Sequence, residues 1–282
     1  MNLQTLQNLR ERGPRALSSR LRGLVQSPRE EGHVLMVHNG RSGSTLLGDM
    51  LDQNPQIFWD GETLEKMFHR LSDEAGQGID KLYGSLSFDA AIAEIEDRLD
   101  RLAGNRVFGT ELQDYHPVMV SSDLERFVER LKRKGFTRFI SLQRSHLRKL
   151  VSHVVATQKE QFHVSSGAKV RVKQIRINPD RIYIGHRFTT LLDALSTYQE
   201  FSEASQRLFA SEDSLFLTYE DHIKSDPTVA LGKALDFLDV ENHQPKINFG
   251  KTTDIAIKDL IENFDEVSDV LAGTAFEHEL AD

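Results

Sequence analysis

Hydrophobic residues along this chain of 282 residues follow two alternating patterns. Short apolar runs predict buried strands at 33–38, 57–60, 106–112, 136–143 and 215–218. Apolar residues that recur every three to four positions predict helices at 44–53, 62–72, 88–102, 121–134, 146–162, 189–209 and 228–238. Strands separated by helices of this length predict an α/β fold with three layers, α/β/α, around a central, mostly parallel sheet.

Polar residues directly follow three of the predicted strands. A segment of glycine, serine and arginine follows the first strand at 38–45, Glu62 comes just after the second strand, and Arg144 closes the fourth. Ligands of open α/β sheets bind beyond the carboxyl ends of the strands. We therefore expect these three features to meet at one edge of the sheet.

The first 31 residues differ from the rest of the chain. They hold six arginines against three glutamates, and leucines recur at helical spacing on both sides of Gly13-Pro14. This pattern predicts an N-terminal helical extension over 1–31 that packs on the domain surface. A peripheral contact with a membrane or a partner is the alternative. Residues 32–282 show no repeat and no linker, which predicts a single domain.

Composition narrows the possible functions. The chain is 39% hydrophobic and 28% charged, an ordinary globular balance, and its net charge of −8 argues against general nucleic-acid binding. It has no cysteine, which excludes disulfides and thiolate catalysis. No apolar run approaches the roughly 18 residues of a membrane span, and the start lacks the apolar core of a signal peptide. We expect a cytoplasmic protein.

The segment 38–45 has the make-up of a phosphate-binding loop. Gly40 and Gly43 allow a sharp turn and a close approach to an anion. The helix that follows directs its free N–H groups and positive dipole end at the loop, and Arg41 adds a charge. Hydroxyl donors come from Ser42, Ser44 and Thr45. A nucleoside-triphosphatase loop, by contrast, has a lysine directly after its second glycine, which is absent here.

The order Arg41-Ser42-Gly43-Ser44-Thr45 resembles the R-[ST]-G-[ST]-[ST] loop of sulfotransferases that use 3′-phosphoadenosine 5′-phosphosulfate (PAPS), in their bacterial and carbohydrate branches. A second mark is Arg144 followed eight residues later by Ser152, the spacing with which this family binds the 3′-phosphate. The resemblance implies a P-loop-like sulfotransferase fold and PAPS as the donor, with 3′-phosphoadenosine 5′-phosphate (PAP) as its product.

Further sequence motifs resemble the family less specifically. The stretch Thr218-Tyr219-Glu220-Asp221 resembles a family motif whose tyrosine lies near the adenine, which implies that Tyr219 contacts the nucleotide. The tail from Lys251-Thr252 onward resembles bacterial sulfotransferase tails, and both residues join the predicted donor site. Leu46 joins it too, although many cytosolic small-molecule sulfotransferases have an aromatic residue at that place.

Two residues are candidates for the base that sulfuryl transfer to a hydroxyl requires. The resemblance to the bacterial and carbohydrate branches favours Glu62, which needs partial burial to raise its pKa. His116 lies where the cytosolic branch places a catalytic histidine and has a suitable intrinsic pKa. Asp60 and Glu111 are lesser candidates. The histidines show no ligand spacing, so we expect no metal.

The sequence thus predicts a sulfotransferase that moves a sulfuryl group from PAPS to an acceptor hydroxyl on a glycan, glycolipid or small metabolite. Glu62, Arg41 and His116 are its catalytic candidates. A kinase-like P-loop enzyme and a non-catalytic nucleotide-binding protein are the alternatives. The basic segment 169–187 is predicted to be irregular, and is either a solvated face or a rim that attracts anions.

Overall fold

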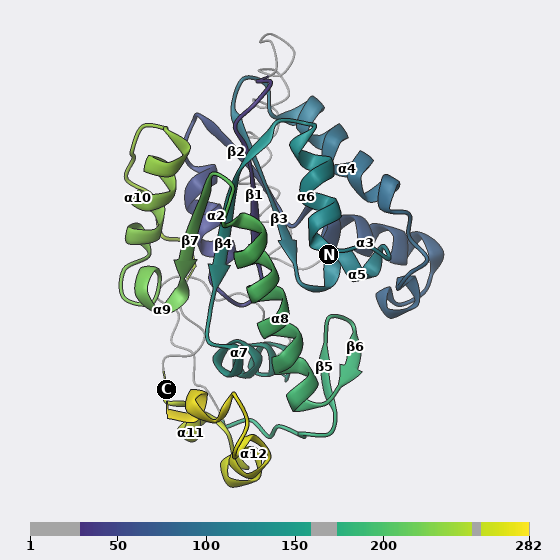
Figure 1. Ribbon diagram of the computed structural model, residues 1–282, viewed down its shortest axis with the longest axis vertical. Helices are drawn as coiled ribbons and strands as arrows, with labels where there is room; N and C mark the ends of the chain where they lie inside the picture. Colours follow the sequence, from purple (N-terminus) through teal and green to yellow (C-terminus); the bar gives the residue numbers. More distant parts are fainter. Residues whose placement is uncertain (1–28, 159–173, 250–254, 282) are drawn as a thin grey trace.

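The computed structural model describes residues 29–158, 174–249 and 255–281 (Figure 1). Five parallel strands form one sheet in the order β2-β3-β1-β4-β7. They are β1 (His33–His38), β2 (Ile57–Gly61), β3 (Val107–Gln113), β4 (Phe136–Gln143) and β7 (Ser214–Thr218). The predicted parallel sheet and its five strands are confirmed.

Helices cover both faces of this sheet (Figure 1). One face packs against α2 (Ser44–Asp52) and α10 (Pro227–Leu238). The other packs against α3 (Thr63–Ala75), α4 (Phe88–Leu102), α6 (Leu124–Lys132) and the end of α8 (Leu191–Phe209). The predicted three-layer α/β/α architecture is confirmed. Short connections include η1 (Ile79–Leu82), α5 (Tyr115–Met119) and α9 (Tyr219–His222).

The central strand β1 shows why two helical layers form. Its residues are all buried, and successive side chains of a strand point to opposite faces. Val34 and Met36 join the core beneath α2 and α10, whereas Leu35 and Val37 join the core beneath α3, α4 and α6. A strand that is apolar on both faces is stable only when helices cover both.

A third group of elements lies beyond the carboxyl ends of the strands (Figure 1). It comprises α7 (His146–Gln158), β5 (Ile182–Ile184), β6 (Arg187–Thr189), α11 (Ile257–Leu260), α12 (Phe264–Leu271) and η2 (Glu277–Ala281). A separate core of buried side chains joins α7 and the start of α8 to the tail, and includes Leu147, Val151, Leu195 and Ile257. This core fixes α7 beside the carboxyl edge of the sheet.

Two local expectations were wrong. The segment 169–187, expected to be irregular, contains strand β5 and the start of a hairpin. Gly185 (φ 49) and His186 (φ 62) form its two-residue turn in the left-handed conformation that such turns require. The helix expected over 121–134 begins only at Leu124, because the Asp123 side chain accepts the Arg126 N–H and caps the helix there.

The described residues leave some predictions untested. Most of the predicted extension, residues 1–28, lies outside them, as do 159–173. The assignment of 32–282 to one domain stays a prediction. Across the described ranges, no helix is both long and apolar enough to cross a bilayer.

Candidate active site

A cavity of about 790 Å³ lies at the carboxyl edge of the sheet. Its walls come from the loop after β1, the starts of α2 and α3, the residues after β3, α7, the β5–β6 hairpin, α8 and α9. The candidate residues that line it are Arg41, Gly43, Ser44, Thr45, Leu46, Glu62, Arg144, Ser152 and Tyr219. The three strand-end features expected to meet therefore do share one cavity, and their roles stay predictions.

The loop between β1 and α2 has an unusual backbone conformation. Gly40 (φ 74), Arg41 (φ 49) and Gly43 (φ 91) are all left-handed, and Gly43 is the N-cap of α2. Such turns direct successive amide groups to one side and form concave anion sites. A Cβ added at Gly43 would come within 2.9 Å of Ile223 and 3.2 Å of Tyr219. The loop therefore needs glycine at this position and has the shape of an anion cradle.

Two arginines meet beside this loop. The Arg41 Nε donates a hydrogen bond of 3.3 Å to the Ser152 Oγ, and the Arg144 Nη1 donates one of 2.8 Å to the Arg41 carbonyl. The Arg144 guanidinium lies 4.1 Å from the centre of the Tyr219 ring. Burial and the charge of Arg144 lower the pKa of Arg41 to about 10, so Arg41 stays charged at neutral pH. Two close cations favour a polyanionic ligand.

Glu62 is one of the carboxylates that line this cavity, together with Glu65 and Asp114. It precedes α3, but its side chain does not cap the helix, so its carboxylate stays available. Burial raises the pKa of Glu62; the nearby His38 opposes this shift, and the negative charges of Glu111 and Glu65 add to it. The side chain is 29% exposed, which keeps it accessible to a ligand in the cavity. These properties suit a general base.

A buried chain of polar contacts stands behind Glu62. The His38 Nδ1 accepts the Gly40 N–H at 2.9 Å, so the ring proton lies on Nε2, which donates to the Glu111 Oε2 at 3.0 Å. The Trp59 Nε1 donates to the other Glu111 oxygen at 2.6 Å. Burial raises the pKa of Glu111, but the hydrogen bond from His38 outweighs it and lowers that pKa. The Glu62 Oε1 lies 3.9 Å from the His38 Nε2.

Within the described residues, His38, Glu62 and Glu111 are the one group whose ligand atoms lie close enough to hold a metal ion. The imidazole does not fit a cation in this arrangement. Its Nδ1 lone pair accepts the Gly40 N–H, and its Nε2 carries the proton donated to Glu111. The expected absence of a metal stays a prediction.

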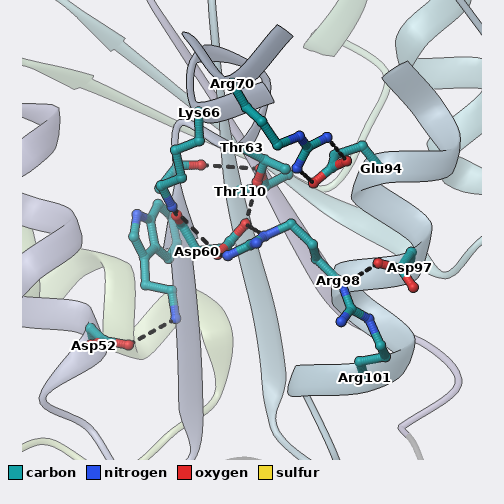
Figure 2. A network of polar contacts seen from close by, with 12 residues as sticks. Asp52, Asp60, Thr63, Lys66, Arg70, Glu94, Asp97, Arg98, Arg101 and Thr110 are labelled. Carbon is teal, nitrogen blue, oxygen red and sulfur yellow. Dashed lines mark hydrogen bonds and ion pairs between the residues drawn. The ribbon is translucent and has the colours of Figure 1, made fainter. Parts of the chain in front are cut away.

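Asp60 holds the start of α3, and with it Glu62, in place. Figure 2 shows Asp60 at the centre of a polar network, where both of its carboxylate oxygens accept hydrogen bonds of 2.5 Å from Arg98 of α4. The Thr63 hydroxyl and the Lys66 ammonium bind the same carboxylate. Burial raises the pKa of Asp60, but Arg98 and Lys66 outweigh it and lower that pKa. Asp60 therefore anchors the start of α3, and its carboxylate is already occupied by Arg98, Thr63 and Lys66.

His116 lies behind the cavity wall. It is fully buried, does not line the cavity, and its Nδ1 accepts the Gln113 N–H at 3.2 Å. Its Nε2 is 3.8 Å from the Glu65 Oε2. Tyr115, the neighbouring residue, lines the cavity instead. His116 can reach a ligand only through such neighbours, which weakens it as the base.

Glu65 is a cavity residue that sequence reasoning missed. Its carboxylate accepts the Tyr115 hydroxyl at 2.5 Å and lies 3.1 Å from the His69 Nε2 and 3.4 Å from the His186 Nε2. Burial raises the pKa of Glu65, but contacts with His116, His186 and His69 outweigh it and hold that pKa well below its usual range. Glu65 joins α3 to the β5–β6 hairpin. In the sequence, its position one helical turn after Glu62 was the available indication that it lies in the same site.

The fold of this chain is similar to that of a sulfotransferase from Alicyclobacillus acidocaldarius, with a TM-score of 0.51 and 12% sequence identity over 91% of this chain and 96% of that chain. This chain has the sulfotransferase fold. A mouse sulfotransferase, SULT7A1 complexed with PAP, gives a TM-score of only 0.39, with 16% identity over 82% of this chain and 67% of that one. No family model and no curated protein matches the sequence.

The remaining candidate residues of this sulfotransferase fold lie outside the cavity lining or outside the described residues. Ser42 is buried away from the cavity, and its hydroxyl has no hydrogen-bond partner among the described residues. Lys251 and Thr252 lie outside the described residues. Glu220 accepts the Ser145 N–H at 3.4 Å and Asp221 accepts the Thr218 hydroxyl at 2.7 Å, which are structural contacts.

Proposed function

We propose that this protein is a sulfotransferase that transfers a sulfuryl group from PAPS to an acceptor hydroxyl. One observation carries the proposal. Arg41 in the loop after β1 and Arg144 after β4 meet in the same cavity, where Ser152 of α7 binds Arg41 directly. Two neighbouring cationic groups suit a donor that carries several phosphate charges, as PAPS does. The sulfotransferase fold supports the same class of reaction.

The donor is held by its charged groups. The loop 41–45 and the N-terminus of α2 bind the 5′-phosphosulfate, because their amides and Arg41 complement its charge. Arg144 and Ser152 bind the 3′-phosphate. The Tyr219 ring, which already stacks on the Arg144 guanidinium, borders the nucleotide together with Leu46.

The chemical step is an in-line displacement at sulfur. The acceptor oxygen forms a bond to sulfur while the bond from sulfur to the phosphate oxygen breaks, and the hydroxyl proton passes to Glu62. Arg41 and the loop amides stabilise the negative charge that grows on the leaving phosphate. Positioning of the two reactants supplies much of the remaining rate enhancement.

The neighbours of Glu62 favour its action as the base. The buried Glu111 carboxylate repels the charge of ionised Glu62, and protonation of Glu62 removes that repulsion. His38 fixes the position of Glu111 through its Nε2 hydrogen bond. Glu62 therefore takes up a proton more readily than a carboxylate exposed to water.

Incubation with [³⁵S]PAPS and a mixture of hydroxyl acceptors tests the proposal. We expect label to pass to acceptor with release of an equal amount of PAP. Tight PAP binding without transfer to any acceptor would indicate the non-catalytic alternative. Phosphate release from ATP and magnesium, with no response to PAPS, would indicate the kinase-like alternative.

A further inference from the structure

Lys149 of α7 is a buried lysine that lines the active-site cavity. Its side chain contacts Tyr198 of α8, with the Nζ 2.9 Å from the ring centre. Lys149 is 5% exposed, and in the described parts of the chain no hydrogen-bond acceptor or carboxylate partner is found for its ammonium group. A buried ammonium group that contacts an aromatic ring but no hydrogen-bond acceptor or carboxylate is still costly, and an anion that enters the cavity offsets that cost.

The groups around Lys149 do not supply this negative charge. Burial lowers the pKa of Lys149 to about 7, and the charge of Asp114, which follows β3, opposes the shift only in part. Burial and the charge of Lys149 lower the pKa of His153, on the same helix, to about 4, so His153 is neutral. Burial raises the pKa of Tyr198 well above its usual value, so its phenol is neutral too.

Two further polar atoms beside Lys149 have no hydrogen-bond partner among the described residues. They are the Tyr198 hydroxyl and the Asn39 Oδ1, both buried in residues that line the cavity. The Asn39 side chain is held in place because its Nδ2 donates to the Tyr198 carbonyl at 3.1 Å. Tyr198 and Asn39 thus each leave a buried polar atom without a hydrogen bond at this part of the wall.

Lys149 lies three residues before Ser152 on α7, and its ammonium group faces Tyr198 of α8. His153 lies one turn further along α7, and its Nε2 contacts the Tyr183 carbonyl of β5 at 2.9 Å. Tyr198 is joined to the loop after β1 through Asn39. Lys149 thus lies between that loop and the β5–β6 hairpin, whereas Arg144 is stacked on Tyr219 of α9.

We propose that Lys149, with the Tyr198 hydroxyl, binds an anionic group of the acceptor, so that the acceptor is a hydroxylated acid. This inference rests on the proposed sulfuryl transfer, since it names the class of acceptor. The acid group pairs with the Lys149 ammonium and receives the Tyr198 hydroxyl proton in a hydrogen bond. The hydroxyl to be modified is then directed toward Glu62 and the loop.

Calorimetric binding of hydroxy acids and their uncharged primary amides to the PAP-saturated protein tests this inference. Suitable pairs are D-glucuronate with D-glucuronamide and 4-hydroxybenzoate with 4-hydroxybenzamide. We expect at least one acid to bind about 10-fold more tightly than its amide, the worth of one charge-assisted contact. Lys149→Met should abolish that preference, and the exposed control Lys81→Met should keep it. The inference is wrong if no acid is preferred, or if Lys149→Met preserves the preference.

A measurement on the unmodified protein tests the inference without relying on correct folding of the variant. Affinity for the preferred acid should fall as the pH rises above about 7, where Lys149 loses its proton, and affinity for the amide should stay constant. Equal pH dependence for acid and amide would contradict the inference.

Binding of the donor shows whether the anion at Lys149 belongs to the acceptor or to the donor. If Lys149→Met weakens binding of PAPS but not of PAP, the anion is the sulfuryl group of the donor and the acceptor assignment is wrong. These assays need PAP to bind but need no transfer of label, so a failure of sulfuryl transfer and a failure to prefer the acid are separate outcomes.

Discussion

The Nε of Arg41 lies 3.3 Å from the Oγ of Ser152, although the two residues are 111 positions apart in the sequence. The contact joins the loop after the central strand to the middle of α7. Parallel strands make this possible, since β1 and β4 are neighbours and both end at the same edge of the sheet. A ligand that binds either residue is therefore within reach of the other.

Removal of either arginine should weaken PAP binding strongly. We expect Arg41→Ala and Arg144→Ala each to raise the dissociation constant about 10- to 100-fold, because a charge-assisted hydrogen bond to phosphate is worth about 1.5–3 kcal/mol. Isothermal titration calorimetry measures the change. Arg207→Ala, at an exposed position on α8, is the matched control and should bind PAP normally. An unchanged affinity in either test variant removes that arginine from the site.

Gly43→Ala should damage both the loop and the ligand site. The added Cβ meets Ile223 and Tyr219, and φ of 91 is strained for alanine, so we expect a loss of about 1–3 kcal/mol in the free energy of unfolding. PAP affinity should fall with it. Gly232→Ala in α10 is the control, since its Cβ meets nothing within 4 Å and the change should stabilise by about 0.4–1 kcal/mol. Equal effects of the two substitutions on urea denaturation would contradict the assigned loop geometry.

Glu62→Gln should separate binding from catalysis. The glutamine keeps the shape but cannot accept the hydroxyl proton, so we expect kcat to fall about 100-fold or more while PAP affinity is kept. In the unmodified protein, kcat should rise with pH through the pKa of Glu62, which burial and Glu111 raise above its ordinary value. That rise should vanish in the variant. Full activity in Glu62→Gln would shift the base to another residue, with His116→Ala as the next variant to assay.

Much of the fold could be predicted because its signals are local. Each buried strand is a short apolar run, and β1, apolar on both faces, indicated helices on both sides. The sharp turn predicted for the loop 38–45 is present, since Gly40 and Gly43 have a left-handed backbone, and its phosphate-binding role stays a prediction. Arg144 and Ser152 were assigned to one phosphate only because their spacing resembles that of the family, and this assignment stays a prediction.

The residues that sequence reasoning missed act through contacts between distant segments. Glu65 gains its role from His186, which a hairpin turn far along the chain brings to 3.4 Å. Lys149 could not be singled out from the sequence, because its burial against Tyr198 depends on how α7 and α8 pack. The reach of His116 was overestimated, since no local pattern shows that it lies behind the cavity wall.

Asp60→Asn should destabilise the protein in a pH-dependent manner. The lowered pKa of Asp60 means that its contribution is complete above the unfolded pKa near 4 and is lost as the pH falls through the folded pKa. We expect a loss of about 3 kcal/mol at pH 7, because Arg98 is left without its partner, and a smaller loss at pH 3. Urea denaturation at several pH values measures this.

The control lies in the same network. Asp97 pairs with Arg101 on the exposed side of α4 (Figure 2), so Asp97→Asn should cost less than about 1 kcal/mol. Comparable losses for the two variants would show that the Asp60 network is no anchor for α3.

The central claim is that the cavity binds a nucleotide with phosphates at both the 3′ and 5′ positions. Calorimetric titration with PAP, adenosine 5′-monophosphate (AMP) and ATP with magnesium tests this directly. PAP should bind at least about 10-fold more tightly than AMP, because only PAP carries the 3′-phosphate that Arg144 and Ser152 would hold. ATP with magnesium should bind more weakly than PAP. Equal affinity for the three nucleotides would contradict the account.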